Sequence, residues 1–118
     1  MANTFKVVTN DAMPASAGTP LALYTVPSST TSVVLGLILA NVHSASVTAS
    51  VQLTSSTAGS NPNTNANVWL AKDVSIPVGS SLEILSGSKV VLQTTDDILI
   101  DCSVTGKIDA TLSIMEQT

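Results

Sequence analysis

Alternation of apolar and polar residues with a period of two is the feature that most limits the folds open to this chain. It runs through three segments, Val47–Thr54, Ile98–Thr105 and Ile108–Met115. Successive side chains of a β-strand point to opposite faces, so this alternation predicts strands with one buried face. Val, Ile and Thr, whose branched side chains suit a pleated surface, are abundant in these segments. No window shows the three-four spacing of an amphipathic helix, so the chain is predicted to be all-β.

Turn-forming clusters of Pro, Gly, Asn and Ser separate the apolar runs at short intervals. Strands are therefore expected at Leu21–Val26, Ser32–Asn41, Val47–Thr54, Asn67–Val74, Ser81–Leu85, Lys89–Gln93, Asp97–Val104 and Lys107–Glu116, with a short further strand at Phe5–Thr9. The chain has 118 residues, of which 44% are hydrophobic, which is enough for one domain with a core of its own. About eight strands in one domain favour a two-sheet antiparallel β-sandwich related to a jelly roll.

The first twenty residues are expected to stand apart from this sandwich. Residues 1–20 are predicted to form an N-terminal arm, and residues 21–118 the sandwich domain. Pro14 and Pro20 favour extended backbone over helix, and Phe5 and Met13 supply apolar side chains that could contact a neighbour. The arm is therefore expected to anchor the subunit to an adjacent molecule.

The segment Ser32–Asn41 is apolar on both faces of the expected strand. Its apolar residues are Val33, Leu35, Leu37 and Leu39 on one face and Val34 and Ile38 on the other, with Gly36 between them. Such a strand is either central and covered on both sides or covered by another subunit. Since only 10% of the residues are charged, little repulsion would keep copies apart. We therefore expect self-association, with a homotrimer as the first expectation.

The charge balance argues against two classes of partner. The chain has four Lys, no Arg and eight acidic residues, for a net charge of −4. Proteins bind nucleic acid and anionic lipid largely through Lys and Arg, so neither nucleic acid nor a membrane surface is an expected partner. The single cysteine, Cys102, cannot form an internal disulfide, which favours folding in a cytoplasm.

No group of residues predicts catalysis or a cofactor. A zinc site needs about four ligands, and the chain has one Cys and one His, Cys102 and His43. Cys102 is expected to point into the core, and His43 to lie exposed in a turn. The nearest approach to a calcium site is Asp96, Asp97 and Asp101, and this stretch is better explained as a turn entering a strand. The chain is thus expected to be non-enzymatic and to hold no cofactor.

Aromatic residues make up only 3% of the chain. Trp69 lies beside the long polar stretch Ser55–Ala66 and is expected to pack in the sandwich or to anchor an interface. An exposed tryptophan face can also stack on a sugar ring. A glycan-binding β-sandwich module is therefore the alternative function from a different class.

One long segment resembles a known family. Residues Leu23–Asn41, LYTVPSSTTSVVLGLILAN, resemble the opening of small virion structural proteins of tailed bacteriophages, cyanophages included. In those proteins a YTVP…TT turn leads into a strand that ends in LAN. The stretches Ala71–Glu83, Lys89–Leu92 and Asp96–Ile98 are similar to their second half. The resemblance covers most of the chain from Leu21 onward.

This resemblance implies a non-enzymatic phage virion protein, made in the host bacterial cytoplasm and located in the virion. The first expectation is a capsid decoration or cement subunit that stabilises the shell through contacts with the major capsid protein. The alternative within the class is a component of the neck, tail or fibre. The candidate interface residues are Phe5, Met13, Tyr24 and Trp69.

Overall fold

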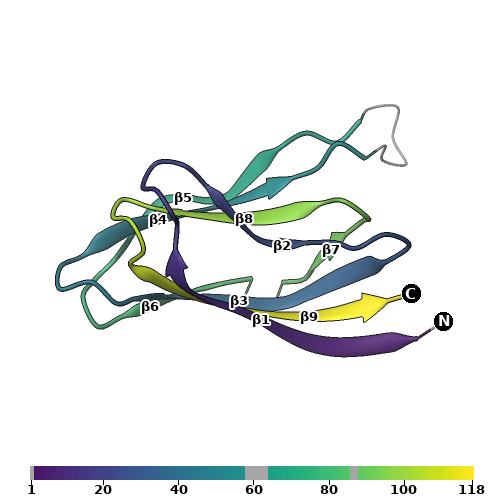
Figure 1. The fold of residues 1–118 in the computed structure, drawn as a ribbon, viewed down its shortest axis with the longest axis horizontal. Coiled ribbons are helices and arrows are strands. Elements are labelled where there is room, and N and C mark those ends of the chain that lie inside the picture. The colour runs from purple at the N-terminus through teal and green to yellow at the C-terminus, as the bar shows by residue number, and fades with distance from the viewer. Residues whose placement is uncertain (1, 58–63, 86–87) are drawn as a thin grey trace.

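Two antiparallel β-sheets pack face to face in the computed structural model, which describes residues 2–57, 64–85 and 88–118 (Figure 1). The described residues form nine strands: β1 (Asn3–Met13), β2 (Leu21–Thr25), β3 (Thr31–Asn41), β4 (Val47–Thr54), β5 (Val68–Ile76), β6 (Ser81–Ile84), β7 (Val90–Leu92), β8 (Asp97–Cys102) and β9 (Ile108–Gln117). Among these residues, no helix is long and apolar enough to cross a membrane.

The order of the strands is that of a jelly roll. One sheet has the order β1-β9-β3-β6, with the short β7 also paired to β3, and the other has the order β2-β8-β4-β5. Early strands thus pair with late ones, β1 with β9, β2 with β8, and β3 with β6 and β7, while β4 and β5 form the closing hairpin. The chain is in effect one long hairpin rolled into two sheets. The predicted antiparallel sandwich is confirmed, and all eight main strands lie close to their expected positions.

The core consists of aliphatic side chains that the two sheets direct toward each other. In β8 and β9, buried residues alternate with less buried ones, as the sequence pattern predicted. The largest fully buried side chains are Met13, Val26, Val34, Leu37, Leu39, Ile76, Leu92, Ile98, Ile100, Ile108, Leu112 and Ile114. Each fully buried aliphatic side chain stabilises the fold by about 1.5–3 kcal/mol relative to exposure.

A bulge in β3 corrects the expected assignment of its two faces. Val34 pairs with Ile114, but Gly36 pairs with the next residue of β9, Ser113, so Leu35 is an extra residue. The extra residue reverses the alternation, because side chains of a strand repeat every two residues. The side chains of Val34, Leu37 and Leu39 therefore all point into the core, whereas Val33, Leu35 and Ile38 lie on the outer side. Both faces are apolar, as predicted, but the residues are divided between them differently.

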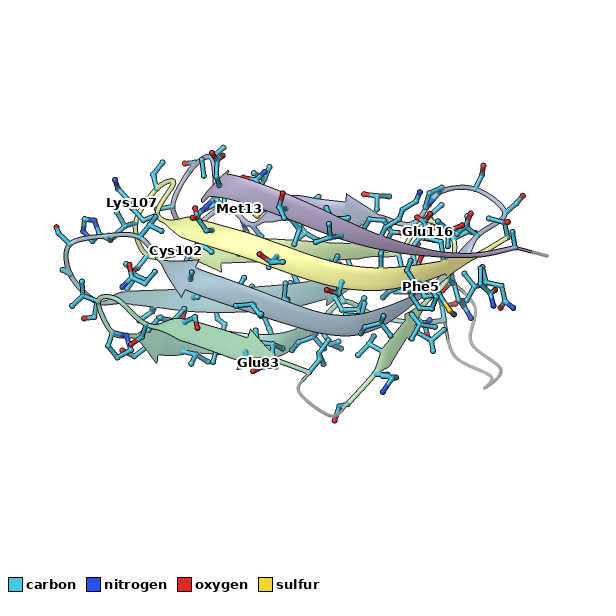
Figure 2. The ribbon with its side chains drawn as sticks, turned by 90° about the horizontal axis from the view of Figure 1, so that it is seen from below. Phe5, Met13, Glu83, Cys102, Lys107 and Glu116 are labelled. Carbon is cyan, nitrogen blue, oxygen red and sulfur yellow. The ribbon has the colours of Figure 1, made fainter. Side chains whose placement is uncertain are left out.

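The predicted N-terminal arm is instead an integral strand. β1 pairs with β9 along its length, from Asn3 opposite Gln117 to Met13 opposite Ile108. Figure 2 shows β1 in the same sheet as β9 and β3, with β9 between β1 and β3. The polar residues after Thr9 suggested that the strand ends there. In the structure the Asn10 side chain accepts a hydrogen bond from the Ala12 N–H at 3.0 Å, and an irregularity before Met13 lets the strand continue.

Met13 is therefore a core residue and not a contact for a neighbour. Its side chain is 0% exposed, whereas Phe5, on the outer side of the same strand, is 72% exposed. The expectation that both residues serve one interface is wrong for Met13.

Met13→Ala should lower the free energy of unfolding by about 2–5 kcal/mol, because it leaves a cavity in the core. Phe5→Ala, the matched truncation on the exposed side of β1, should change it by less than about 1 kcal/mol. Urea unfolding followed by circular dichroism measures both. Equal and small effects of Met13→Ala and Phe5→Ala would instead support the predicted N-terminal arm.

Cys102, at 2% exposure, is buried as expected. Cys102→Ser should destabilise the fold by about 1–3 kcal/mol, because it buries a hydroxyl in an apolar site. Thermal unfolding measures the loss, and a thiol reagent should label the native protein slowly. Rapid labelling of the folded protein would contradict this placement.

Candidate interaction surface

The outer face of the β1-β9-β3-β6 sheet carries a continuous row of apolar side chains. Phe5 of β1 lies opposite Met115 of β9, Met115 lies opposite Val33 of β3, and Val33 lies opposite Val91 of β7. Ile114, the neighbour of Met115, is fully buried, so this row points away from the core. With strands spaced about 4.8 Å apart, four side chains span roughly 14 Å. We call this row, together with Val7 and Leu35 beside it, the outer band.

The outer band is uncharged, and four of its six side chains are exposed, whereas Met115 and Val33 are partly buried. The exposed fractions are 65% for Val7 and 61% for Val91, beside the 72% of Phe5. Flanking positions on the same face of β1, β9 and β3 are Asn3, Ser113, Gln117 and Thr31, none of which is charged. Single exposed apolar residues are normal, whereas contiguous apolar patches with a polar rim often belong to binding surfaces.

A partly buried polar network lies behind the outer band and joins the two sheets. The Tyr24 hydroxyl on β2 donates to Glu116 Oε2 at 2.6 Å and lies 2.6 Å from Ser32 Oγ. Glu116 and Ser32 face each other across β9 and β3. Lys6 Nζ of β1 contacts Glu116 Oε1 at 2.7 Å. The network therefore connects four strands at the end of the sheet where Figure 2 shows Phe5 and Glu116.

The network shifts two pKa values in opposite directions. The hydrogen bond from Lys6 and then that from Tyr24 hold the pKa of Glu116 below its usual range. Burial, followed by the hydrogen bond to the Glu116 carboxylate, raises the pKa of Tyr24 to about 12. Glu116 is thus favoured as a carboxylate and Tyr24 as a neutral phenol, which is the pair of states that the hydrogen bonds require. Tyr24, a predicted interface residue, directs its hydroxyl inward and supports the sheet that carries the outer band.

Trp69, the fourth predicted interface residue, belongs to the other sheet. It is on β5, at the edge of the other sheet, and is 42% exposed. The Lys72 ammonium lies 4.3 Å from the centre of its ring. A sugar would have to displace Lys72 or stack on the opposite face. The structure therefore does not bring Trp69 together with Phe5 and Tyr24.

The acidic residues considered for calcium are engaged separately. Asp96 accepts hydrogen bonds from the Ser55 hydroxyl and the Gln93 N–H, and Asp97 from the Thr54 hydroxyl. Asp101 accepts the Gly18 N–H at 3.0 Å, at a different position on β8. Within residues 2–57, 64–85 and 88–118, no three His, Cys, Asp or Glu side chains are grouped to hold a metal ion.

An open hollow of about 420 Å³ lies where β1 and β9 run side by side. It is lined by Thr9, Asn10, Asp11, Asp109, Ala110 and Thr111. Its lining offers two carboxylates and two hydroxyls. His43 is not part of this lining and lies in the turn after β3, where its N–H donates to Asn41 Oδ1 at 2.7 Å.

No protein-family model matches this sequence, and no curated protein matches it. Among solved structures, a chain from infectious bursal disease virus, Gx strain, aligns with a TM-score of 0.55 at 13% identity. A chain from the VP2 subviral particle of infectious bursal disease virus aligns with a TM-score of 0.53, also at 13% identity. Each match covers 97% of this chain and 32% of the viral chain, so this chain spans about a third of those chains.

A chain from the appendages of Bacillus endospores aligns with a TM-score of 0.48 at 12% identity, over 99% of this chain and 87% of the other. At such identities, the two viral chains show that the fold is shared and nothing more. A relation to tailed-bacteriophage proteins stays a prediction.

Glu116→Gln should lower the free energy of unfolding at neutral pH by about 1–3 kcal/mol, because it removes a charged partner of Lys6. The folded-state pKa of Glu116 lies below its unfolded value of about 4.3, so this contribution is present above that pH. It is lost as the pH falls through the lower folded value. The stabilities of the variant and the native protein should therefore converge on acidification.

Urea unfolding between neutral and strongly acidic pH measures this convergence. Glu83→Gln, at an exposed carboxylate on β6 of the same sheet, is the matched control and should have little effect at any pH. A gap between Glu116→Gln and the native protein that stays constant with pH would contradict the role of the carboxylate charge.

Proposed function

We propose that this protein is a non-enzymatic structural subunit of a tailed-bacteriophage virion, and that it decorates the capsid as a cement subunit. In this proposal, the outer band binds the major capsid protein. The subunit then contributes to the particle by burying surface across neighbouring capsid subunits.

The observation that carries this proposal is the outer band itself. It places four apolar side chains in register across four strands, on the face of the sheet opposite the core. A soluble chain seldom leaves such a row in water unless a partner covers it. The apolar centre and polar surroundings also match the usual anatomy of an interface, a core of apolar residues within a polar rim.

The polar network behind the outer band is consistent with a surface that binds a partner. The Tyr24–Glu116–Lys6 network ties β1 and β9 to the opposite sheet directly behind Phe5. A rigid surface loses little conformational entropy when it binds, so more of the contact energy remains as affinity. A subunit that binds the assembled shell and not its free components stabilises the assembled state by mass action.

Two further observations favour a virus particle as the location. The fold is shared with chains of infectious bursal disease virus and of its VP2 subviral particle. The Leu23–Asn41 segment, which resembles small phage virion proteins, forms β2, the following turn and β3, the strand that contributes Val33 and Leu35 to the outer band. A component of the neck, tail or fibre would use the same surface against a different partner.

Val91→Lys should reduce binding to tail-less capsids at least tenfold, because it places a charge in the apolar row that the contact would bury. Sedimentation of labelled protein with capsids that lack it measures the binding, with isolated tails as a parallel sample. Val78→Lys, at a valine that is also exposed but lies in the turn between β5 and β6, is the matched control and should bind normally.

Binding to isolated tails alone would assign the subunit to the tail and replace the cement proposal. Binding to neither particle would contradict a virion role. Equal loss of binding in Val91→Lys and Val78→Lys would show that charge in general, and not the outer band, governs the contact.

A further inference from the structure

β1 presents a long open edge of the sheet. It is the end strand of the β1-β9-β3-β6 order and is 11 residues long. An exposed edge strand carries a row of backbone N–H and C=O groups that another strand can bind.

The hydrogen bonds between Ala2 and Thr118, at the end of the β1–β9 pairing, show which backbone groups of β1 are free. The Ala2 N–H donates to the Thr118 carbonyl at 3.2 Å, and the Thr118 N–H donates to the Ala2 carbonyl at 3.0 Å. In an antiparallel ladder, pairs of opposite residues that exchange both backbone hydrogen bonds alternate with pairs that exchange none. Since Ala2 is a hydrogen-bonded residue, the other even-numbered residues of β1 also bond to β9. The odd-numbered residues Asn3, Phe5, Val7 and Thr9 therefore turn their N–H and C=O groups to the open edge.

β1 carries few of the devices that protect an edge strand. Proline, charged side chains, β-bulges or a short length commonly block pairing at an edge. Asn3–Met13 contains no proline, and its one irregularity lies beyond Asn10. Its single lysine, Lys6, is half-exposed and is paired with Glu116 at 2.7 Å. The residues with free backbone groups carry uncharged side chains, and Phe5 and Val7 are among the most exposed apolar residues of the described chain.

We infer that β1 of one copy pairs antiparallel with β1 of a second copy, around a two-fold axis at Val7. The two β1-β9-β3-β6 sheets then become one continuous sheet. A second copy suits this edge because two identical strands related by a two-fold axis are antiparallel by symmetry, and both carry the same uncharged residues with free backbone groups. Each free group on one strand then meets its counterpart on the other.

The register follows from charge and length. Odd residues must pair with odd residues, since only these have outward groups. Centring on Val7 pairs Phe5 with Thr9 of the second copy and uses the regular part of the strand, before the irregularity between Asn10 and Met13. In this register the neighbour across from Lys6 is Val8. Centring on Lys6 would also pair odd residues but would set two lysines opposite each other, which is destabilising.

This joint shares Phe5 and Val7 with the outer band, but it uses their backbone groups and does not rest on the proposed function. The joint uses the edge of β1, whereas the band lies on the face of the sheet and extends to β7 at its other side. A two-fold contact produces dimers, in place of the trimers expected from the sequence. A strand-edge joint falls at the low end of specific interfaces, below about 1,200 Å² in total, so the dimer should form at micromolar concentrations.

Sedimentation velocity over a micromolar concentration series tests the joint directly. The native protein should pass from monomer to dimer, and Val7→Lys should shift the transition to at least tenfold higher concentration. Val7→Pro should do the same, because it removes only an N–H that faces the open edge, where proline is tolerated. Val91→Lys is the matched control, since it makes the same change on the far side of the same sheet and should dimerise normally. Circular dichroism confirms that each variant is folded.

Oxidative cross-linking then tests the register, in a Cys102→Ala background. Val7→Cys should form a disulfide-linked dimer, because the two Val7 positions face each other across the axis. Phe5→Cys and Thr9→Cys should not cross-link alone but should cross-link when mixed.

A native protein that stays monomeric throughout the series, or that forms trimers, overturns the inference. So does a Val91→Lys variant that loses the dimer as fully as Val7→Lys does. Cross-linking of Phe5→Cys alone overturns the register at Val7. Because capsid binding is measured separately with Val91→Lys, failure of this joint and failure of the cement proposal give different results.

Discussion

The structure depends most on the position of β9 between β1 and β3. Its inward residues Ile108, Ala110, Leu112 and Ile114 are buried, and Glu116 continues the same row as the centre of the polar network. Its outward residue Met115 lies between Phe5 and Val33 in the outer band. Both edges of β9 are hydrogen-bonded, so this one strand fixes the core, the network and the exposed row together. A change in the register of β9 would exchange buried and exposed residues on the whole strand.

The network around Glu116 also shows how a chain with few charges uses them. The carboxylate is buried but accepts hydrogen bonds from Tyr24 and contacts Lys6, so its charge is compensated. Removing one partner of such a group is costly, because the other remains buried and unpaired. Many of the exposed residues are Ser, Thr and Asn, which do not repel a second copy. Low charge on the surface and a well-paired charge inside are both compatible with a subunit that works through contact.

Much of the fold could be predicted from the sequence because the relevant signals are local. Alternation in Val47–Thr54 and Ile108–Met115 identified strands and their buried faces, and turn residues marked the ends. The inward position of Cys102 followed from the same periodicity. The outer band could have been found only in part. The apolar second face of β3 indicated a covered surface, but nothing local shows that Phe5 and Val91 lie in register with it.

The amino-acid sequence by itself determined the all-β class, the approximate strands and the absence of an obvious catalytic motif, because side-chain periodicity and turn chemistry act over a few residues. Only the tertiary structure decided what each strand pairs with. It made β1 a member of the sheet because β9 offers a long partner, and it placed Met13 in the core. It also inserted Leu35 as a bulge, which redistributed the apolar residues of β3. These outcomes depend on contacts between residues distant in the chain, and the energy of such contacts cannot be inferred from any one segment of the sequence.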